Sequence, residues 1–373
     1  MLRLETRPQP SKAMSLASPL IALAITVVIG VVLFWILGKD PLRGLQMFFV
    51  EPMKNVYGLA ELSVKATPLI LIALGLAVCY RSNVWNIGAE GQYIFGALGA
   101  GWVAMQAGPA TEWMGHAFLI PILLAGVLAG MGWAGVVALL RDRFSANEIL
   151  VSLMLVYVAD LLLGWLVNGP WQDPNGHNFP QTITFLAQTR LPRLIPGMRA
   201  HIGVLVALVA VACFWVFLFR TYRGYALQVG GLAPAAARYA GFSSRSALWI
   251  GLLISGGMAG LAGALETAGP LGQLTPYVPA GYGFAAIIVA YVGRLHPVGI
   301  VLSGFLMSLF YIGGELAQSR LGLPKALTGV FQGLLLFTLL ACDTLIHYRV
   351  RWRSAPASLP TARRQVATST TQA

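Results

Sequence analysis

Long apolar runs separated by short charged stretches dominate this 373-residue chain. The first run, residues 17–37, holds no charged side chain, and as a helix it would rise about 31 Å, the thickness of a bilayer core. Nine further runs repeat the pattern; they cover 66–80, 88–107, 117–140, 148–168, 201–219, 247–268, 283–294, 297–317 and 325–346. The pattern predicts an all-α polytopic membrane protein with about ten transmembrane helices.

One of these runs is too short for a straight crossing. Residues 283–294 would rise about 18 Å as a helix, against a bilayer core of about 30 Å. The segment is therefore expected either to lie half-buried or to extend through the preceding Gly-Tyr-Gly.

Composition supports the membrane assignment. Charged residues make up 10% of the chain and hydrophobic residues 57%, whereas a soluble domain averages about 25% charged residues. The three cysteines and five histidines lie far apart, so they predict no disulfide framework and no metal site.

Basic side chains gather on one predicted side of the membrane. An even number of crossings puts both termini on that side, and Lys and Arg accumulate in cytoplasmic loops. These positions are Arg3, Arg7, Lys12, Arg81, Arg141, Arg143, Arg220, Arg223, Arg238, Arg245, Arg294, Arg349, Arg351, Arg353, Arg363 and Arg364. The net charge of +12 is thus explained by topology rather than by nucleic-acid binding. The exception is the loop 169–200, where three arginines outnumber one aspartate on the predicted outer side.

This topology divides the chain into three parts. Residues 1–16 form a cytoplasmic N-terminal arm, and residues 17–346 form the transmembrane domain. That domain includes an outer loop at 169–200 and a cytoplasmic loop at 220–246. The basic tail 347–373 is rich in Ser, Thr, Ala and Pro and is expected to be disordered in the cytoplasm.

The cytoplasmic loop contains a short predicted helix. Pro234 suits a first helical turn, and Gly241 is placed to end the helix about two turns later. Ser243 or Ser244 can cap the next span. Because isolated helices this short are marginal in water, we favour a helix that docks against a partner, and a simple surface turn is the alternative.

Motifs for chemistry are missing from the sequence. It contains no GxxxxGK[ST] phosphate loop and no HExxH, and no spacing suggests a nucleophile with its base. The chain is therefore not expected to be an enzyme or to bind a cofactor.

Five ordered stretches resemble a known family. They are NVWNIGAEGQ at 83–92, ANEILVSLMLVYVA at 146–159, the loop 224–249, SGGMAGLAGALE at 255–266 and GYGFAAIIVAYVGRLHPVGIVLSG at 281–304. Together they resemble the permease subunits of ABC importers of the ribose and nucleoside type, within the superfamily of branched-chain amino acid and sugar permeases. The first two stretches are similar to the nucleoside subgroup.

The resemblance implies a function and a set of partners. The chain would be a multi-pass permease of the bacterial plasma (inner) membrane that carries nucleosides by alternating access. It would pair with a second permease, homologous or identical, dock cytoplasmic ATPases that use the ATP, and receive solute from an extracytoplasmic binding protein. An ABC permease for simple sugars or another polar solute is the alternative, and a secondary transporter, which needs no coupling helix, is less favoured.

The same resemblance assigns the cytoplasmic loop to ATPase coupling. The residues that match or flank the family's coupling helix are Gly230, Pro234, Ala236, Ala237, Arg238, Tyr239 and Gly241. Four positions depart from the family's pattern. Gln228 replaces an arginine, Gly231 and Leu232 replace a Glu-Asn pair, and Ala235 replaces a glutamate. Docking is expected to be kept, whereas the polar contacts that select an ATPase are expected to differ.

Five polar residues in apolar surroundings are candidates for the solute pathway or its gate: Asn86, Glu90, Gln92, Asp160 and Glu266. Asn86 can instead be the N-cap of the third span, with Glu90 in its first turn, and we favour this capping role over a gate. Asp160 and Glu266 should face protein or water rather than lipid; they would bind a solute hydroxyl or only another helix.

Glu148, at the start of the fifth span, can likewise be a helix cap or a transport residue. Ser145 and Glu148 have the spacing of a capping box, and we favour that role for Glu148 over transport.

Overall fold

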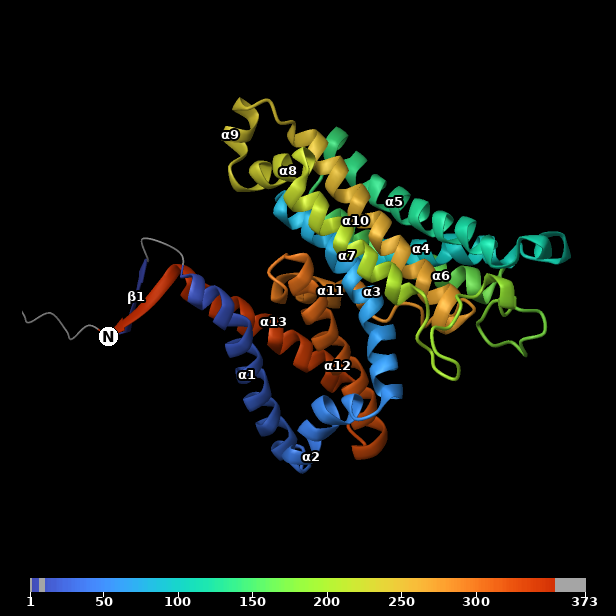
Figure 1. Ribbon diagram of the computed structural model, residues 1–373, viewed down its shortest axis with the longest axis horizontal. Helices are drawn as coiled ribbons and strands as arrows, with labels where there is room; N and C mark the ends of the chain where they lie inside the picture. Colours follow the sequence, from blue (N-terminus) through green and yellow to red (C-terminus); the bar gives the residue numbers. More distant parts are fainter. Residues whose placement is uncertain (1, 7–10, 353–373) are drawn as a thin grey trace, which may run out of the picture. The chain divides into compact units, whose positions relative to one another are not determined.

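The computed structural model describes residues 2–6 and 11–352 (Figure 1). Two compact units divide the chain: residues 26–336 form the larger, and residues 1–25 with 337–373 form the smaller. Most of the predicted tail, 353–373, lies outside the described residues.

Each of the ten predicted spans contains a helix. They are α1 (Lys12–Ile36), α3 (Val56–Arg81), α4 (Ala89–Met105), α5 (Leu119–Phe144), α6 (Glu148–Asn168), α7 (Gly203–Arg220), α10 (Ser244–Glu266), α11 (Tyr282–Val292), α12 (Pro297–Leu321) and α13 (Ala326–His347). Among the described residues, eight segments are long and apolar enough to cross a membrane. At 17 and 11 residues, α4 and α11 are shorter than these eight segments, and the count of about ten crossings stays a prediction.

Short elements connect these helices. They are α2 (Pro41–Leu45), a π-helix at Gln46–Val50, 3-10 helices at Glu51–Met53, Pro109–Phe118 and Ala187–Thr189, α8 (Tyr222–Leu232), α9 (Pro234–Tyr239), and a π-helix at Thr267–Leu271 that prolongs α10.

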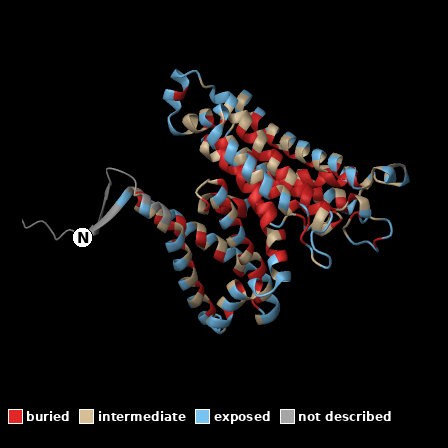
Figure 2. Cartoon of the chain, viewed as in Figure 1, coloured by how far each residue is buried: buried red, intermediate tan, exposed pale blue. Residues whose placement is uncertain are grey.

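The core of the larger unit is built around α3. Of the eighteen-residue apolar window in α3, 89% is buried, against 22% in α6 and 17% in α7. The helices α10, α11 and α12 pack against α3, and α4, α5 and α10 pack against one another; Figure 2 shows burial concentrated there. Glycines permit this close approach, because a Cβ at Gly96 or Gly130 would collide with the backbone of α10 at Gly260 or Gly256.

The predicted outer loop, 169–200, together with residues 201–202 that join it to α7, is held by backbone hydrogen bonds rather than by helix. The N–H groups of Thr182, Phe185 and Leu191 donate to the carbonyls of Leu274, Gly272 and Ala268 at 3.0, 2.8 and 2.8 Å. Its five prolines, which exclude continuous helix, thus leave an extended chain that runs along the end of α10.

The smaller unit joins the two ends of the chain. Strand β1 (Leu2–Thr6) pairs antiparallel with β2 (Tyr348–Trp352), and the Ser18 hydroxyl donates to the Asp343 carboxylate at 2.6 Å. The all-α expectation is therefore correct for the spans and wrong for these ten terminal residues. Residues 348–352 were expected to be part of a disordered tail, and pairing with β1 orders them.

Two predicted caps are replaced by neighbours. The N-cap of α4 is Gly88, not Asn86, whose Oδ1 instead accepts from the N–H of Gly88 at 3.0 Å. Ser145 adopts a left-handed conformation at the end of α5, and Asn147 caps α6 by accepting from the N–H of Ile149 at 2.9 Å. Glu148 pairs with Arg141 at 3.3 Å, so the predicted capping box does not form.

Candidate functional site

Glu90 holds the start of a different helix. It lies in the first turn of α4, as expected, and its side chain is buried. Its carboxylate accepts the backbone N–H of Gly281 at 2.9 Å and that of Gly283, where α11 begins. The first N–H groups of a helix lack partners within the helix and carry its positive dipole end. Glu90 therefore caps α11 across the bundle rather than α4 alone.

This contact lies deep in the bundle. The other end of α11 is fixed where the carbonyl of Leu295 accepts from Arg81, the last residue of α3, at 2.9 Å. Eleven helical residues rise about 16 Å, which is about half of a bilayer core. Both α4 and α11 thus begin at one junction inside the bundle, and α11 accounts for the run that was too short to cross alone.

Asn86 and Gln92 form a closed amide pair beside this junction. Each side chain donates to the other, at 2.9 and 3.1 Å, and Asn86 also donates to the Ser255 hydroxyl on α10 at 2.9 Å. All three side chains are buried. The pair is satisfied internally, as buried amides require, and it fixes the segment 82–88 against α10.

Three tyrosines connect the junction to a cavity. Tyr93, Tyr282 and Tyr311 meet edge to face in sequence, with ring centroids 5.9 and 5.4 Å apart. The hydroxyls of Tyr93 and Tyr282 are buried and meet no hydrogen-bond partner among the described residues. The Tyr311 hydroxyl donates to the carbonyl of Ala280 at 3.2 Å, which precedes the Gly281 held by Glu90.

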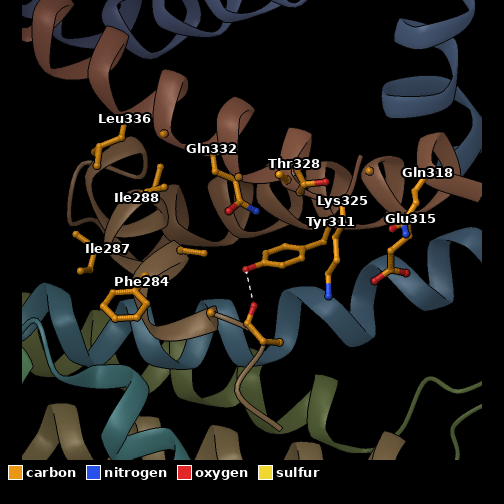
Figure 3. Close-up of a pocket in the computed structure, with 17 residues that line it drawn as sticks. Phe284, Ile287, Ile288, Tyr311, Glu315, Gln318, Lys325, Thr328, Gln332 and Leu336 are labelled. Carbon is orange, nitrogen blue, oxygen red and sulfur yellow. Dashed lines mark hydrogen bonds between the residues drawn. The ribbon is translucent and has the colours of Figure 1, made fainter. Parts of the chain in front are cut away.

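A cavity of about 710 Å³ opens between α11, α12 and the start of α13. Figure 3 shows its lining divided along its length. Apolar side chains occupy one end, and polar ones occupy the end near the α12–α13 connection. The apolar group is Phe284, Ile287, Ile288 and Leu336, and the polar group is Tyr311, Glu315, Gln318, Lys325, Thr328 and Gln332. Sequence reasoning missed this polar group, because its members are scattered singly over two spans.

Glu266 and Asp160 lie in different environments. Glu266 is buried, and its electrostatic neighbours are Lys65, Arg199 and Glu61. Asp160 is exposed on the flank of α6 and interacts electrostatically with Glu90. The structure therefore brings Asp160 near Glu90 and places Glu266 with a charged group at the outer loop, where Arg199 pairs with Glu61 at 3.2 Å.

The predicted cytoplasmic loop, 220–246, folds into two helices, α8 and α9, of which only α9 was expected. Gly241, at φ +82°, ends α9 as predicted, and Ser243 caps α10 by accepting from the N–H of Ser246 at 3.3 Å. Ala236, Arg238 and Tyr239 are exposed, Tyr239 to 97%. Of the residues assigned to ATPase coupling, Pro234 begins α9 and is exposed, and Gly230 in α8 is half-buried.

Ala237 differs from its neighbours on α9 because it is buried. It was expected on the docking face with Ala236. Its methyl group instead packs inside the loop, and a small cavity of about 180 Å³ lies beside it. A bulky substitution at Ala237 would therefore disrupt the loop itself.

Arg81 ties this loop to α11. Besides donating to Leu295, its guanidinium donates to the Gln228 side chain at 2.7 Å and lies over the Phe219 ring. The carbonyl of Arg81 packs so closely on Gly231 that no Cβ fits there. Gln228 and Gly231 thus both lie against Arg81: an arginine at 228 would oppose a like charge, and any side chain at 231 would collide.

The described residues hold no group of three or more metal-ligating side chains. The arrangement consists of helix ends, amides and a solvent-open cavity. It can position a polar solute and transmit movement between helices.

Comparisons with known proteins identify relatives along most of the chain. Residues 58–340 match the family described as the permease component of branched-chain amino acid transport systems. A glucose ABC transporter permease of Haloferax volcanii is 34% identical, over 95% of this chain and 97% of its own length. A guanosine permease of Bacillus subtilis is 29% identical over 84% and 89%, and a nucleoside permease of Lactococcus lactis is 24% identical over 88% and 91%. No solved structure matches the chain significantly.

Proposed function

Because this chain belongs to the family of permease components of branched-chain amino acid transport systems, we propose below which solute it carries and how ATP drives it. It is the membrane-spanning permease subunit of an ABC importer and a multi-pass protein of the inner membrane. The observation that carries this conclusion is similarity along nearly the whole chain to permeases of that class.

The proposed solute is a nucleoside. Relatives named for guanosine and for nucleosides cover more than four fifths of the chain. A simple sugar is the second candidate, because the glucose permease relative shares 34% identity over 95% of the chain. Both classes present a ring with neighbouring hydroxyl groups, so the same permease architecture suits either.

The proposed topology places both termini, α8 and α9 in the cytoplasm and the 169–200 loop outside. The arginine distribution favours this orientation. Pairing of β1 with β2 supports it as well, because two strands that pair in water lie on the same side of a membrane. The ten predicted crossings give this arrangement, because an even number puts both termini on one side and the fifth crossing ends outside.

Separate ATPase subunits are proposed to dock on α9. Ala236, Arg238 and Tyr239 are exposed on this short helix, and an exposed aromatic among small side chains is typical of an interface. The ATP is used by these partners, and this chain is proposed to bind none. An extracytoplasmic binding protein is proposed to deliver solute to the outer side.

A second permease subunit is proposed to cover the flank of α6. An exposed carboxylate in a membrane span is costly in lipid, and Asp160 lies near the middle of α6 on its exposed side. A second permease, with a solute pathway between the two chains, would give this carboxylate a polar environment.

Arg81 is proposed to couple the ATPase to the pathway. It joins α8, through Gln228, to the end of α11, through Leu295. The other end of α11 meets Glu90 and lines the cavity. Movement of the loop is thereby passed along an 11-residue helix to the junction at Glu90.

Reconstitution tests this function. The permease, its ATPase, the second permease and the binding protein are placed in proteoliposomes, and uptake of labelled guanosine and of labelled glucose is measured with ATP inside or omitted. We expect ATP-dependent guanosine uptake that unlabelled glucose does not inhibit. Glucose uptake alone would support the second candidate, and uptake driven by an ion gradient without ATP would contradict the class.

A further inference from the structure

We propose that the polar end of the α11–α13 cavity is a solute subsite that binds the vicinal hydroxyl groups of a neutral solute. This inference rests on the proposed importer function and adds the place and chemistry of recognition within the permease. The volume of the cavity, about 710 Å³, lies in the range of small-molecule sites, about 300–1,000 Å³.

The lining groups suit hydroxyls. Glu315 can accept two hydroxyl hydrogens, and Gln318 and Gln332 each offer a donor and an acceptor. Glu315 and Gln318 are exposed, so a solute can reach both, whereas Gln332 is half-exposed and its Nε2 is buried without a hydrogen-bond partner in the part of the chain that the structure describes. A carboxylate with two amides matches a diol better than it matches an ion or a hydrocarbon.

Charge balance favours a neutral solute. The cavity is lined by one carboxylate, Glu315, and one ammonium, Lys325. Lys65, which does not line the cavity, forms an ion pair with Glu315 at 3.4 Å and fixes its position from behind. An anionic solute would be repelled by Glu315, and a cationic solute would be repelled by Lys325, within the same cavity.

The apolar end accounts for the rest of the solute. Phe284, Ile287 and Ile288 lie along α11 and face the cavity with Leu336 (Figure 3). A flat base can lie against such a surface while its ribose reaches the polar end. A hexose would occupy the polar end alone.

Tyr311, which lines the cavity, connects solute binding to α11. Tyr311 lines the cavity and donates to the carbonyl of Ala280, and the next residue, Gly281, is held by Glu90. An occupied subsite therefore touches the half-helix that Arg81 joins to the cytoplasmic loop.

The test compares a solute with its analogue lacking the hydroxyls. Uptake of guanosine and of 2′,3′-dideoxyguanosine is measured in the reconstituted complex, each at saturating binding protein loaded with that solute. We expect the wild type to favour guanosine about tenfold, since a site built for hydroxyls rejects analogues without them. Glu315→Gln and Gln332→Leu should reduce this ratio to about twofold or less.

Two further variants separate recognition from structure. Ser319→Ala, on the same helix but not lining the cavity, should keep the wild-type ratio. Lys65→Met removes the ion pair while leaving the Glu315 carboxylate, and it should keep most of the preference. Selectivity imposed by the binding protein is common to all variants, so it cancels when their ratios are compared.

The uptake ratios separate failure of the subsite from failure of the proposed solute class. Wild-type ratios in both cavity variants would overturn the subsite while leaving the importer function intact. If the wild type carries glucose instead, the same comparison uses glucose and 2,3-dideoxyglucose, which has no vicinal hydroxyl pair. Should the wild type carry neither solute, the proposed solute class is wrong and the subsite falls with it.

Discussion

At the scale of single residues, the carboxylate of Glu90 shows why a local signal can be correct and incomplete. Its place in the first turn of α4 follows from the sequence, and the dipole argument predicts only about 0.3–1 kcal/mol for it. The structure adds two backbone N–H groups of α11, in a buried place where water cannot replace the lost bonds. Its contribution is therefore larger than the dipole alone.

Glu90→Gln should lower the unfolding free energy by about 2–3 kcal/mol, because hydrogen bonds to charged groups contribute about 1.5–3 kcal/mol each and the amide can accept only through its single oxygen. Thermal unfolding of the purified permease in detergent measures this. The matched control is Glu112→Gln, at an exposed position. Equal melting temperatures for the two variants would contradict the clamp, and lost uptake at unchanged stability would favour a gate.

His201 makes the outer loop sensitive to acid. Burial, with a smaller effect of Arg199, lowers its pKa to about 4, and its Nδ1 accepts the N–H of Gly203 at 3.1 Å, which requires an unprotonated Nδ1. The unfolded loop binds a proton below about pH 6.5. The contribution of neutral His201 to the unfolding free energy is therefore fully present above about pH 6.5 and is lost as the pH falls toward 4. At pH 5 the loss amounts to about 2 kcal/mol.

Limited proteolysis of the 169–202 loop at pH 7.5 and pH 5 measures this effect. We expect faster cleavage at pH 5 in the wild type and a smaller pH difference in His201→Asn. His177→Asn, at an exposed position of the same loop, should behave like the wild type. Cleavage that is independent of pH would exclude the His201 mechanism.

At the scale of elements, α9 is the proposed docking helix, and its side chains are not interchangeable because they differ in burial. Ala236→Trp adds bulk on the exposed face, and overpacking of an interface costs about 1–3 kcal/mol. We expect at least fivefold weaker co-purification of the ATPase and lower solute-stimulated ATP hydrolysis. Arg238→Glu should act in the same direction if an acidic group of the ATPase faces it.

The controls for α9 follow from burial. Ala187→Trp, exposed in the outer loop, should leave association unchanged. Ala237→Trp should lower the abundance of the permease itself, because Ala237 is buried. If Ala236→Trp and Arg238→Glu both retain full association and stimulation, α9 is not the coupling element.

Arg81 also acts between elements, because it joins the end of α3 to α8 and to the segment that follows α11. Arg81→Leu removes its bonds to Gln228 and Leu295, and we expect uptake to fall about tenfold while the ATPase still co-purifies. Arg143→Leu, at the exposed end of α5, is the matched control. Parallel measurement of ATP hydrolysis and uptake in proteoliposomes would reject this role if the ratio of uptake to hydrolysis stayed at the wild-type value.

At the scale of the whole molecule, the arginine distribution predicts the orientation of the chain. Single cysteines at Asn175 and Ala235, both exposed, are introduced after Cys79, Cys213 and Cys342 are replaced. In intact cells a membrane-impermeant thiol reagent should label position 175 and not position 235, and permeabilised cells should label both. Labelling of position 235 from outside would show that the orientation is wrong.

The sequence by itself determined where the helices lie and how the cytoplasmic loop is bounded. All ten apolar runs contain helices because hydropathy and helix length are properties of contiguous residues. Pro234, Gly241 and Ser243 act within one or two turns of their own positions, so their roles could be read locally.

Only the tertiary structure decided how these helices make a site. Glu90 meets Gly283 across 193 positions, and Arg81 meets Leu295 across 214; no local pattern encodes such pairs. The polar end of the cavity assembles from side chains that alternate with apolar ones on α12 and α13. Sequence hydropathy averages over such residues, and only packing reveals that they face the same space.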